Sequence, residues 1–215
     1  MQLPFSRAEF LDSFAGYNLA WWPAAVLLWL LTLGALVMVY RRSSGAGAVF
    51  SAVLGLHWAW AGAAYHLEFF RQINPAATAF GLLFLAQAGL LFWLGVAHRR
   101  LEFVPSRSPW GRVGGALMAY ALLYPVLGIL GGLRYPALPT FGVPCPTTIL
   151  TVGALLTVPR RTARLPSGVP VLWSAIGGSA VLLLGMTADL MLPIAGALVL
   201  LYILTPDRAP ADVRR

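Results

Sequence analysis

Cys145, the single cysteine of the 215-residue chain, lies between two prolines in the segment PCPTT. Proline is favoured at the first position of a helix, so we expect a helix to start at Pro146, with Thr147 and Thr148 in its first turn. A helix amino end and a neighbouring arginine, here Arg134, both stabilise a thiolate. Sulfur and imidazole ligands suit monovalent copper, and the set expected for such an ion is His66, Cys145, Met186 and Met191. No Cys-x-x-Cys or His-x-x-x-His pair supports this set, and no cofactor is assigned.

Other polar residues are expected at the same depth as Cys145, at one rim of a helix bundle. They fall at the ends of apolar stretches, where a small solute could be bound. The predicted rim comprises Tyr65, His66, Glu68, Asn74, Arg134, Tyr135, Cys145, Thr147, Thr148, Met186, Asp189 and Met191.

A second candidate group lies near the middle of the apolar stretches. At a rise of about 1.5 Å per residue, His57, Gln87 and Tyr124 reach similar depths. We expect a hydrogen-bonded cluster that satisfies these polar groups in apolar surroundings. Two interpretations remain open, because the cluster could serve packing alone, or His57 could relay protons or bind substrate.

Seven apolar stretches must position these residues. The chain is 59% hydrophobic and only 10% charged, a balance far from that of a soluble domain. The sequence therefore predicts an all-α, polytopic membrane protein with seven transmembrane helices. The stretches are 19–40, 46–69, 76–98, 113–133, 143–158, 169–186 and 190–204.

Arginines set the expected orientation. Twelve of them fall on alternate loops that would share one side, and only Arg7, Arg71 and Arg134 fall on the other. The positive-inside rule then places the amino terminus outside and the carboxyl terminus in the cytoplasm, with a prokaryotic inner membrane as the expected location.

Several function classes are excluded by composition. All fifteen basic residues are arginine, so lysine-dependent P-loop, retinal and pyridoxal chemistry is absent. The longest polar segment, 98–112, leaves no room for an extramembrane catalytic domain, and we expect no enzyme. Arginines at helix ends suit anionic lipid headgroups, so the predicted partner is the lipid bilayer and not nucleic acid.

The whole chain, 1–215, is expected to form one integral-membrane domain. Residues 1–18 should form a short amphipathic helix with a capping box of Ser6 and Glu9, residues 19–205 the seven-helix bundle, and residues 206–215 a cytoplasmic tail. The stripe Phe10, Leu11, Phe14 and Tyr17 favours a lipid anchor over a substrate lid. Four prolines between Leu133 and Thr148 forbid a regular helix there, so that loop must be buried in protein or line an aqueous cavity.

Four segments carry a resemblance to a known family. PFSRAEFLDSFAGYN, AYHLEFFRQINPAATAFG, RYPALPTFGVPCPTTI and LWSAIGGSAVLLLG are similar to the bacterial and archaeal membrane-protein family DUF6064, a domain of unknown function. The resemblance covers essentially the whole chain. It implies a multi-pass membrane protein and no established activity.

Two functions stay open at this point. One is a small permease or channel for a small solute or ion that enters from the outer face. The other is a non-transporting membrane module, such as a sensor, a lipid-interacting scaffold or a subunit of a membrane complex. A polar path from the rim to His57 would favour transport, whereas a closed core would favour the module.

Overall fold

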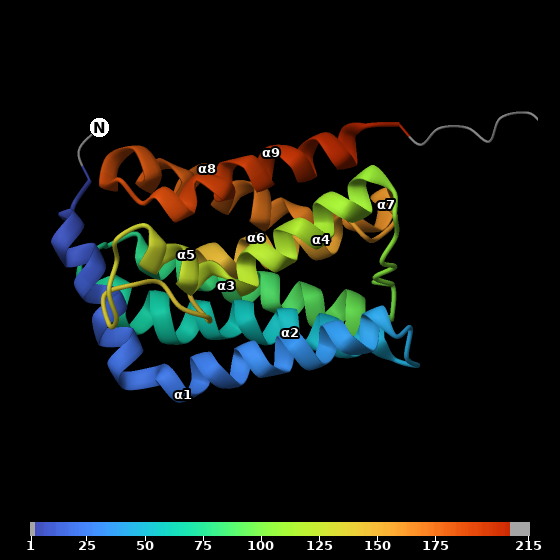
Figure 1. The fold of residues 1–215 in the computed structure, drawn as a ribbon, viewed down its shortest axis with the longest axis horizontal. Helices are drawn as coiled ribbons and strands as arrows, with labels where there is room; N and C mark the ends of the chain where they lie inside the picture. The colour runs from blue at the N-terminus through green and yellow to red at the C-terminus, as the bar shows by residue number, and fades with distance from the viewer. Residues whose placement is uncertain (1–2, 207–215) are drawn as a thin grey trace, which may run out of the picture.

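The computed structural model describes residues 3–206, apart from the side chains of residues 180–182, and shows a bundle of helices that run mainly along one direction (Figure 1). No strand occurs in this part of the chain, so the prediction of an all-α fold is confirmed. The expected tail, 206–215, lies outside the described residues except for Pro206. The helices in order are α1 (Arg7–Tyr40), α2 (Ala46–Trp60), η1 (Ala61–Phe69), η2 (Phe70–Gln72), α3 (Ala77–Leu91), η3 (Phe92–Ala97), α4 (Pro109–Leu122), α5 (Tyr124–Leu130), α6 (Pro144–Leu155), α7 (Arg160–Ala163), η4 (Leu165–Ser167), α8 (Gly168–Leu184), η5 (Thr187–Leu190) and α9 (Met191–Leu204).

Four helical segments within the described residues are long and apolar enough to cross a membrane. They are Arg7–Tyr40, Ala46–Gln72, Ala77–Ala97 and Thr187–Leu204. A fifth candidate combines α4 and α5, which meet at a bend of 65°. Large apolar side chains, among them Leu27, Leu30 and Leu201, are more than half exposed, as contact with lipid tails requires.

Helix α6 is shorter than the expected stretch 143–158 and lies in the middle of the bundle. Its 12 residues would rise only about 18 Å, less than the roughly 30 Å of a hydrocarbon core. Every one of them is buried, so neighbouring helices, and not lipid, surround both ends. The backbones of α4 and α6 meet closely where a Cβ added to Gly114 would lie 2.5 Å from the carbonyl oxygen of Gly153.

The arginine-rich turns lie at one end of the bundle, and the turns with few arginines lie at the other (Figure 1). The turns after α1, η3 and α6, and the end of α9, lie at one end, which we call the arginine end (Figure 1). Arg7, Arg71 and Arg134 belong to segments at the opposite end, which we call the lid end. The first and last described residues thus lie at opposite ends.

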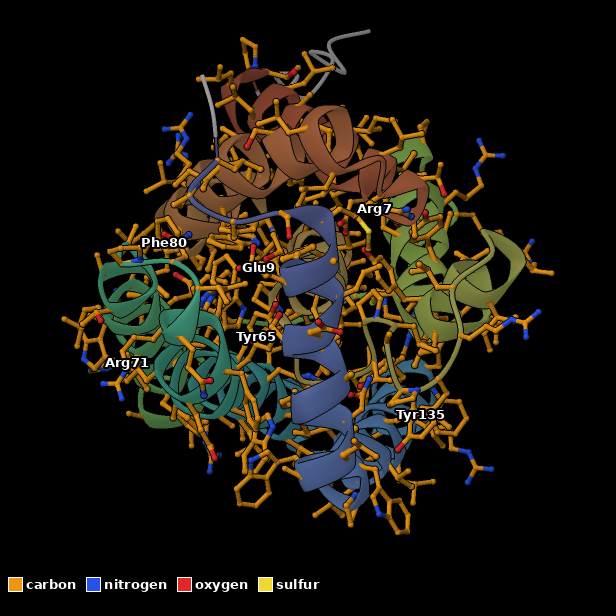
Figure 2. The ribbon with its side chains drawn as sticks, turned by 90° about the vertical axis from the view of Figure 1, so that its left-hand side faces the viewer. Arg7, Glu9, Tyr65, Arg71, Phe80 and Tyr135 are labelled. Atoms are coloured by element: carbon orange, nitrogen blue, oxygen red, sulfur yellow. The ribbon has the colours of Figure 1, made fainter. Side chains whose placement is uncertain are left out.

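Residues 7–20, the amino-terminal part of α1, cross the lid end of the bundle instead of running along it (Figure 2). Backbone angles at Trp21 are non-helical, and the ring of Pro23 removes an amide from the next turn, so the helix bends there. We call residues 7–20 the lid. Phe10, Phe14 and Tyr17 face the bundle and are buried, so the expectation that this stripe faces lipid as a simple anchor is wrong.

Candidate functional site

The lid starts where the sequence predicts. Ser6 and Glu9 form the expected capping box, in which the Ser6 hydroxyl accepts from the Glu9 amide and the Glu9 carboxylate accepts from the Ser6 amide. The next two turns pack aromatic rings onto the bundle, because Phe14 stacks on Tyr65 with ring centroids 5.3 Å apart. Ser13 and Tyr65 also share a hydrogen bond of 3.1 Å. The lid is therefore held by both rings and hydroxyls.

Asn18 connects the lid to the proline-rich loop after α5. Its side-chain amide donates to the carbonyl oxygens of Pro136 at 2.6 Å and Leu138 at 2.7 Å. Its side-chain oxygen accepts from the hydroxyl of Thr140 at 2.5 Å. The second half of the loop, 138–143, is thus mainly buried against protein, one of the two environments expected for irregular backbone, while Arg134 and Tyr135 are exposed.

A cavity of about 160 Å³ lies between the lid and the bundle. Aromatic and aliphatic side chains form most of its wall, and none of the described Asp, Glu or Arg side chains lines it. The lining residues are Leu3, Phe5, Phe10, Phe14, Tyr65, His66, Phe70, Asn74, Phe80, Pro144, Cys145, Trp173, Ile176, Gly177 and Ser179.

His66 is the most unusual residue of this wall. It lies on the π-helix η1, a type of helix found frequently at functional sites, and is fully buried. Rings surround it, with the centroids of Phe84 at 4.7 Å and Trp173 at 5.0 Å. Neither ring nitrogen has a hydrogen-bond partner among the described residues. Buried polar atoms in proteins are normally paired, so these two nitrogens are an exception that calls for an explanation.

Cys145 lines the same cavity and continues into a buried polar group. The hydroxyl of Tyr124 donates a hydrogen bond to the carboxyl of Asp189, and the thiol of Cys145 lies close to both groups. Asp189 is only 2% exposed and lies on η5, between α8 and α9. The expectation that Arg134 stabilises a Cys145 thiolate is wrong, because Arg134 is exposed, whereas the thiol is buried with the carboxyl of Asp189 close to it.

The expected midplane cluster does not form. His57 pairs with the hydroxyl of Thr32 at 2.8 Å, and its ring packs against Phe141. Gln87 donates to the carbonyl oxygen of Pro166 at 2.8 Å, and Tyr124 bonds to Asp189. The three residues were expected at one depth, but each side chain points toward a different neighbour and none of them bonds to another. His57 does not line the cavity that contains Cys145.

Most other predicted rim residues have structural roles. The Glu68 carboxylate accepts from the Trp21 indole at 3.2 Å, and the Asn74 side chain accepts from the amide of Ala76. The Tyr135 hydroxyl donates to the backbone oxygen of Asn18 at 3.4 Å.

Of the two predicted threonines, Thr148 bonds back to the carbonyl oxygen of Pro144, while the buried hydroxyl of Thr147 has no partner in the described chain. The helix there begins at Pro144, two residues before the expected start at Pro146.

The proposed metal ligands are only partly brought together. His66 and Cys145 share the cavity, but Met186 packs in the aromatic cluster under the lid, and Met191 packs on the main core. The described residues contain no group of three or more His, Cys, Asp or Glu side chains that could hold a metal ion. The expected set of His66, Cys145, Met186 and Met191 is therefore not supported as a metal centre.

Sequence reasoning missed Trp173 and Phe84, which enclose His66, and Asn18, which fixes the loop. Aromatic residues in apolar helices usually indicate packing, so nothing in their spacing distinguishes a cavity wall. The asparagine did carry a signal, because a buried amide near the start of a membrane span needs partners.

Comparisons with known proteins give a family and nothing closer. No curated protein and no solved structure matches the chain. The profile described as a family of unknown function, DUF6064, matches residues 7–213, nearly the whole length, and the chain belongs to that family.

Proposed function

We propose that this chain is a membrane protein that crosses the bilayer seven times, with the lid end outside, and binds a small solute in the cavity beneath the lid. The observation that carries the proposal is the fully buried His66, which lines the cavity and whose two ring nitrogens have no hydrogen-bond partner among the described residues. A binding site with apolar walls and a few polar groups is typical of small-molecule recognition.

The seven crossings are supported by the positions of the chain ends and arginines. Because the described chain starts at one end of the bundle and finishes at the other, an odd number of crossings is required if each traverse spans the membrane. The helices of the fifth and sixth traverses, α6 and α8, have 12 and 17 residues and lie within the bundle. Arginines at one end favour that end as cytoplasmic. The prokaryotic inner membrane stays a prediction.

Of the two functions that the sequence left open, the non-transporting module is favoured by the environment of His57. This histidine is 1% exposed, bonds to Thr32 and packs against Phe141. His57 therefore offers no continuation of the cavity, and a sensor that reports occupancy through the lid fits this arrangement.

A small permease remains the second candidate because of one observation. Cys145 lines the cavity, and behind it Tyr124 and Asp189 share a buried hydrogen bond, so a polar pair lies next to the cavity inside the bundle. Buried acids in membrane bundles often belong to ion or proton pathways.

Cysteine accessibility distinguishes the two candidates. We would place the substitution His57→Cys in a Cys145→Ser background and add a membrane-impermeant maleimide to intact cells. The module predicts no labelling of position 57 until the protein is denatured. The Cys145→Ser control has no cysteine and should not be labelled before or after denaturation. Labelling of position 57 from outside would show a path to the midplane and replace the module by the permease. In parallel, a reporter fused after Arg215 should be active only in the cytoplasm, and activity outside would overturn the orientation.

A further inference from the structure

We propose that the cavity recognises a neutral, ring-sized molecule with one hydroxyl group, of which phenol is the simplest example, and that this molecule enters sideways between α3 and α8. The inference rests on the proposed function, since it names the ligand class of the same cavity.

The volume of the cavity sets the size of the ligand. About 160 Å³ is close to the roughly 150 Å³ of an engineered apolar cavity that binds benzene. It would hold only about five waters at roughly 30 Å³ each, and its apolar wall offers few partners for them. A single six-membered ring with one small substituent therefore fits, whereas a sugar, nucleotide or peptide does not.

The wall favours an aromatic ring. Phe10, Phe14, Phe80 and Trp173 all line the cavity and contact one another or His66 in edge-to-face geometry, as do Phe80 and Trp173 at a centroid distance of 5.3 Å. Aromatic rings prefer such edge-to-face or offset contacts, each of which adds stability beyond area burial. An aromatic ligand can extend this arrangement.

The polar atoms of the wall select a hydroxyl. The neutral imidazole of His66 presents one donor and one acceptor, and both nitrogens lack partners among the described residues. The indole nitrogen of Trp173 has no partner there either, and it lies 3.1 Å from where a Cβ on the cavity residue Gly177 would be. A hydroxyl is both donor and acceptor, so one such group can satisfy the acceptor nitrogen of His66 and accept a second hydrogen bond.

Charge on the ligand is disfavoured by the same wall. Among the described residues no arginine or acid lines the cavity, and the buried carboxyl of Asp189 already accepts a hydrogen bond from Tyr124. Burying an ion without a counter-charge costs far more than burying a hydroxyl. Phenol should therefore bind, and benzoate should not.

The entrance lies at the side of the bundle. Among the lining residues, Ser179 of α8 is exposed, while Ile176 of α8, Phe80 of α3 and Asn74 just before α3 are half-buried, as are Leu3 and Phe5 ahead of the lid. In the view onto the lid end, Phe80 lies to one side of the lid and not beneath it (Figure 2). An apolar molecule dissolved in the outer part of the bilayer would reach the cavity by this route.

The test uses the full chain in lipid nanodiscs, with Cys145 as its own reporter. Because Cys145 is the only cysteine and lines the cavity, the mass increase with N-ethylmaleimide measures access to the site. We expect phenol to slow this alkylation, roughly tenfold at ten times the concentration that gives half-maximal protection. In wild type, benzene should need at least about fivefold more than phenol, because it leaves His66 unpaired, and benzoate should not protect.

Matched variants assign the effect to His66. His66→Phe should raise the phenol concentration for half-maximal protection at least about fivefold and leave the value for benzene unchanged. His98→Phe changes an exposed histidine far from the cavity and should change neither value. Should the thiol react too slowly to time, or His66→Phe fail to fold, the comparison of phenol, benzene and benzoate is made on wild type from the rise in melting temperature.

Two outcomes would overturn the inference, and they differ in whether the cavity still stands as a ligand site. Equal protection by benzene and phenol would refute hydroxyl recognition but leave the cavity as a ligand site. Absence of any effect by all ring-sized compounds would refute the ligand class, and would also remove the support that the cavity gives to the proposed function.

Discussion

Asn18 is the residue whose replacement should most clearly loosen the lid. It is 1% exposed, and its side chain makes three hydrogen bonds to the proline-rich loop, to the carbonyl oxygens of Pro136 and Leu138 and to the hydroxyl of Thr140. Asn18→Ala removes all three and leaves the carbonyl oxygen of Leu138 and the hydroxyl of Thr140 without this partner, while the carbonyl oxygen of Pro136 keeps its bond from the amide of Leu138.

The expected loss follows from the number of bonds. A hydrogen bond contributes about 1 kcal/mol net, and a buried group left unpaired costs about 1–3 kcal/mol. Thr140 is only half-buried and can bond to water, so the loss in free energy of unfolding should be about 3 kcal/mol. For a chain of this length that corresponds to a fall of roughly 6–12 °C in melting temperature.

Thermal unfolding of the purified protein in detergent measures this loss, and a double-mutant cycle apportions it. Thr140→Val alone should cost about 1 kcal/mol, and in the Asn18→Ala background it should cost almost nothing, since its partner is already gone. Asn18→Asp keeps the acceptor for Thr140 and should fall between. If Asn18→Ala changes the free energy of unfolding by less than about 0.5 kcal/mol, the loop is not held by this side chain and the account of the lid is wrong.

Two further predictions concern helix packing and capping. Gly153→Ala should destabilise the protein by about 1–3 kcal/mol, because its Cβ would lie 2.8 Å from the carbonyl oxygen of Gly114, whereas Gly89→Ala meets nothing within 4 Å and should be neutral or slightly stabilising in the same unfolding assay. Ser6→Ala should lower the stability of the lid by about 1 kcal/mol, because the capping box with Glu9 is lost, and amide hydrogens of the lid should then exchange faster. Ser6→Thr keeps a capping hydroxyl and should exchange like wild type. Unchanged exchange in Ser6→Ala would show that the cap contributes nothing.

The elements follow from local chemistry, and this is why their positions could be predicted. Apolar stretches, turn residues and the pairing of Ser6 with Glu9 are local signals, and each predicted stretch contains a helix. The sequence did not reveal which segments each helix packs against or how deeply it is buried. The burial of α6 on every side and the turn of the lid across the bundle at Trp21 depend on contacts between distant segments.

The site was predicted in part for the same reason. His66 and Cys145 were expected at one rim and do share the cavity, because their depth along the helices fixes the end of the bundle at which they lie. Depth does not fix direction around a helix. His57 and Gln87, at similar depth, therefore bond to Thr32 and Pro166 instead of to each other.

The most direct test of the central claim, a cavity that opens between α3 and α8, is the rate at which N-ethylmaleimide alkylates Cys145 when its predicted mouth is blocked. Ser179→Trp places a large side chain at the mouth, and Leu172→Trp places one on the same exposed face of α8, about 10 Å farther from the lid end. The account predicts that Ser179→Trp slows alkylation severalfold while Leu172→Trp leaves the rate of wild type. Equal rates in wild type and Ser179→Trp would contradict it, because Cys145 would then be reached by another route.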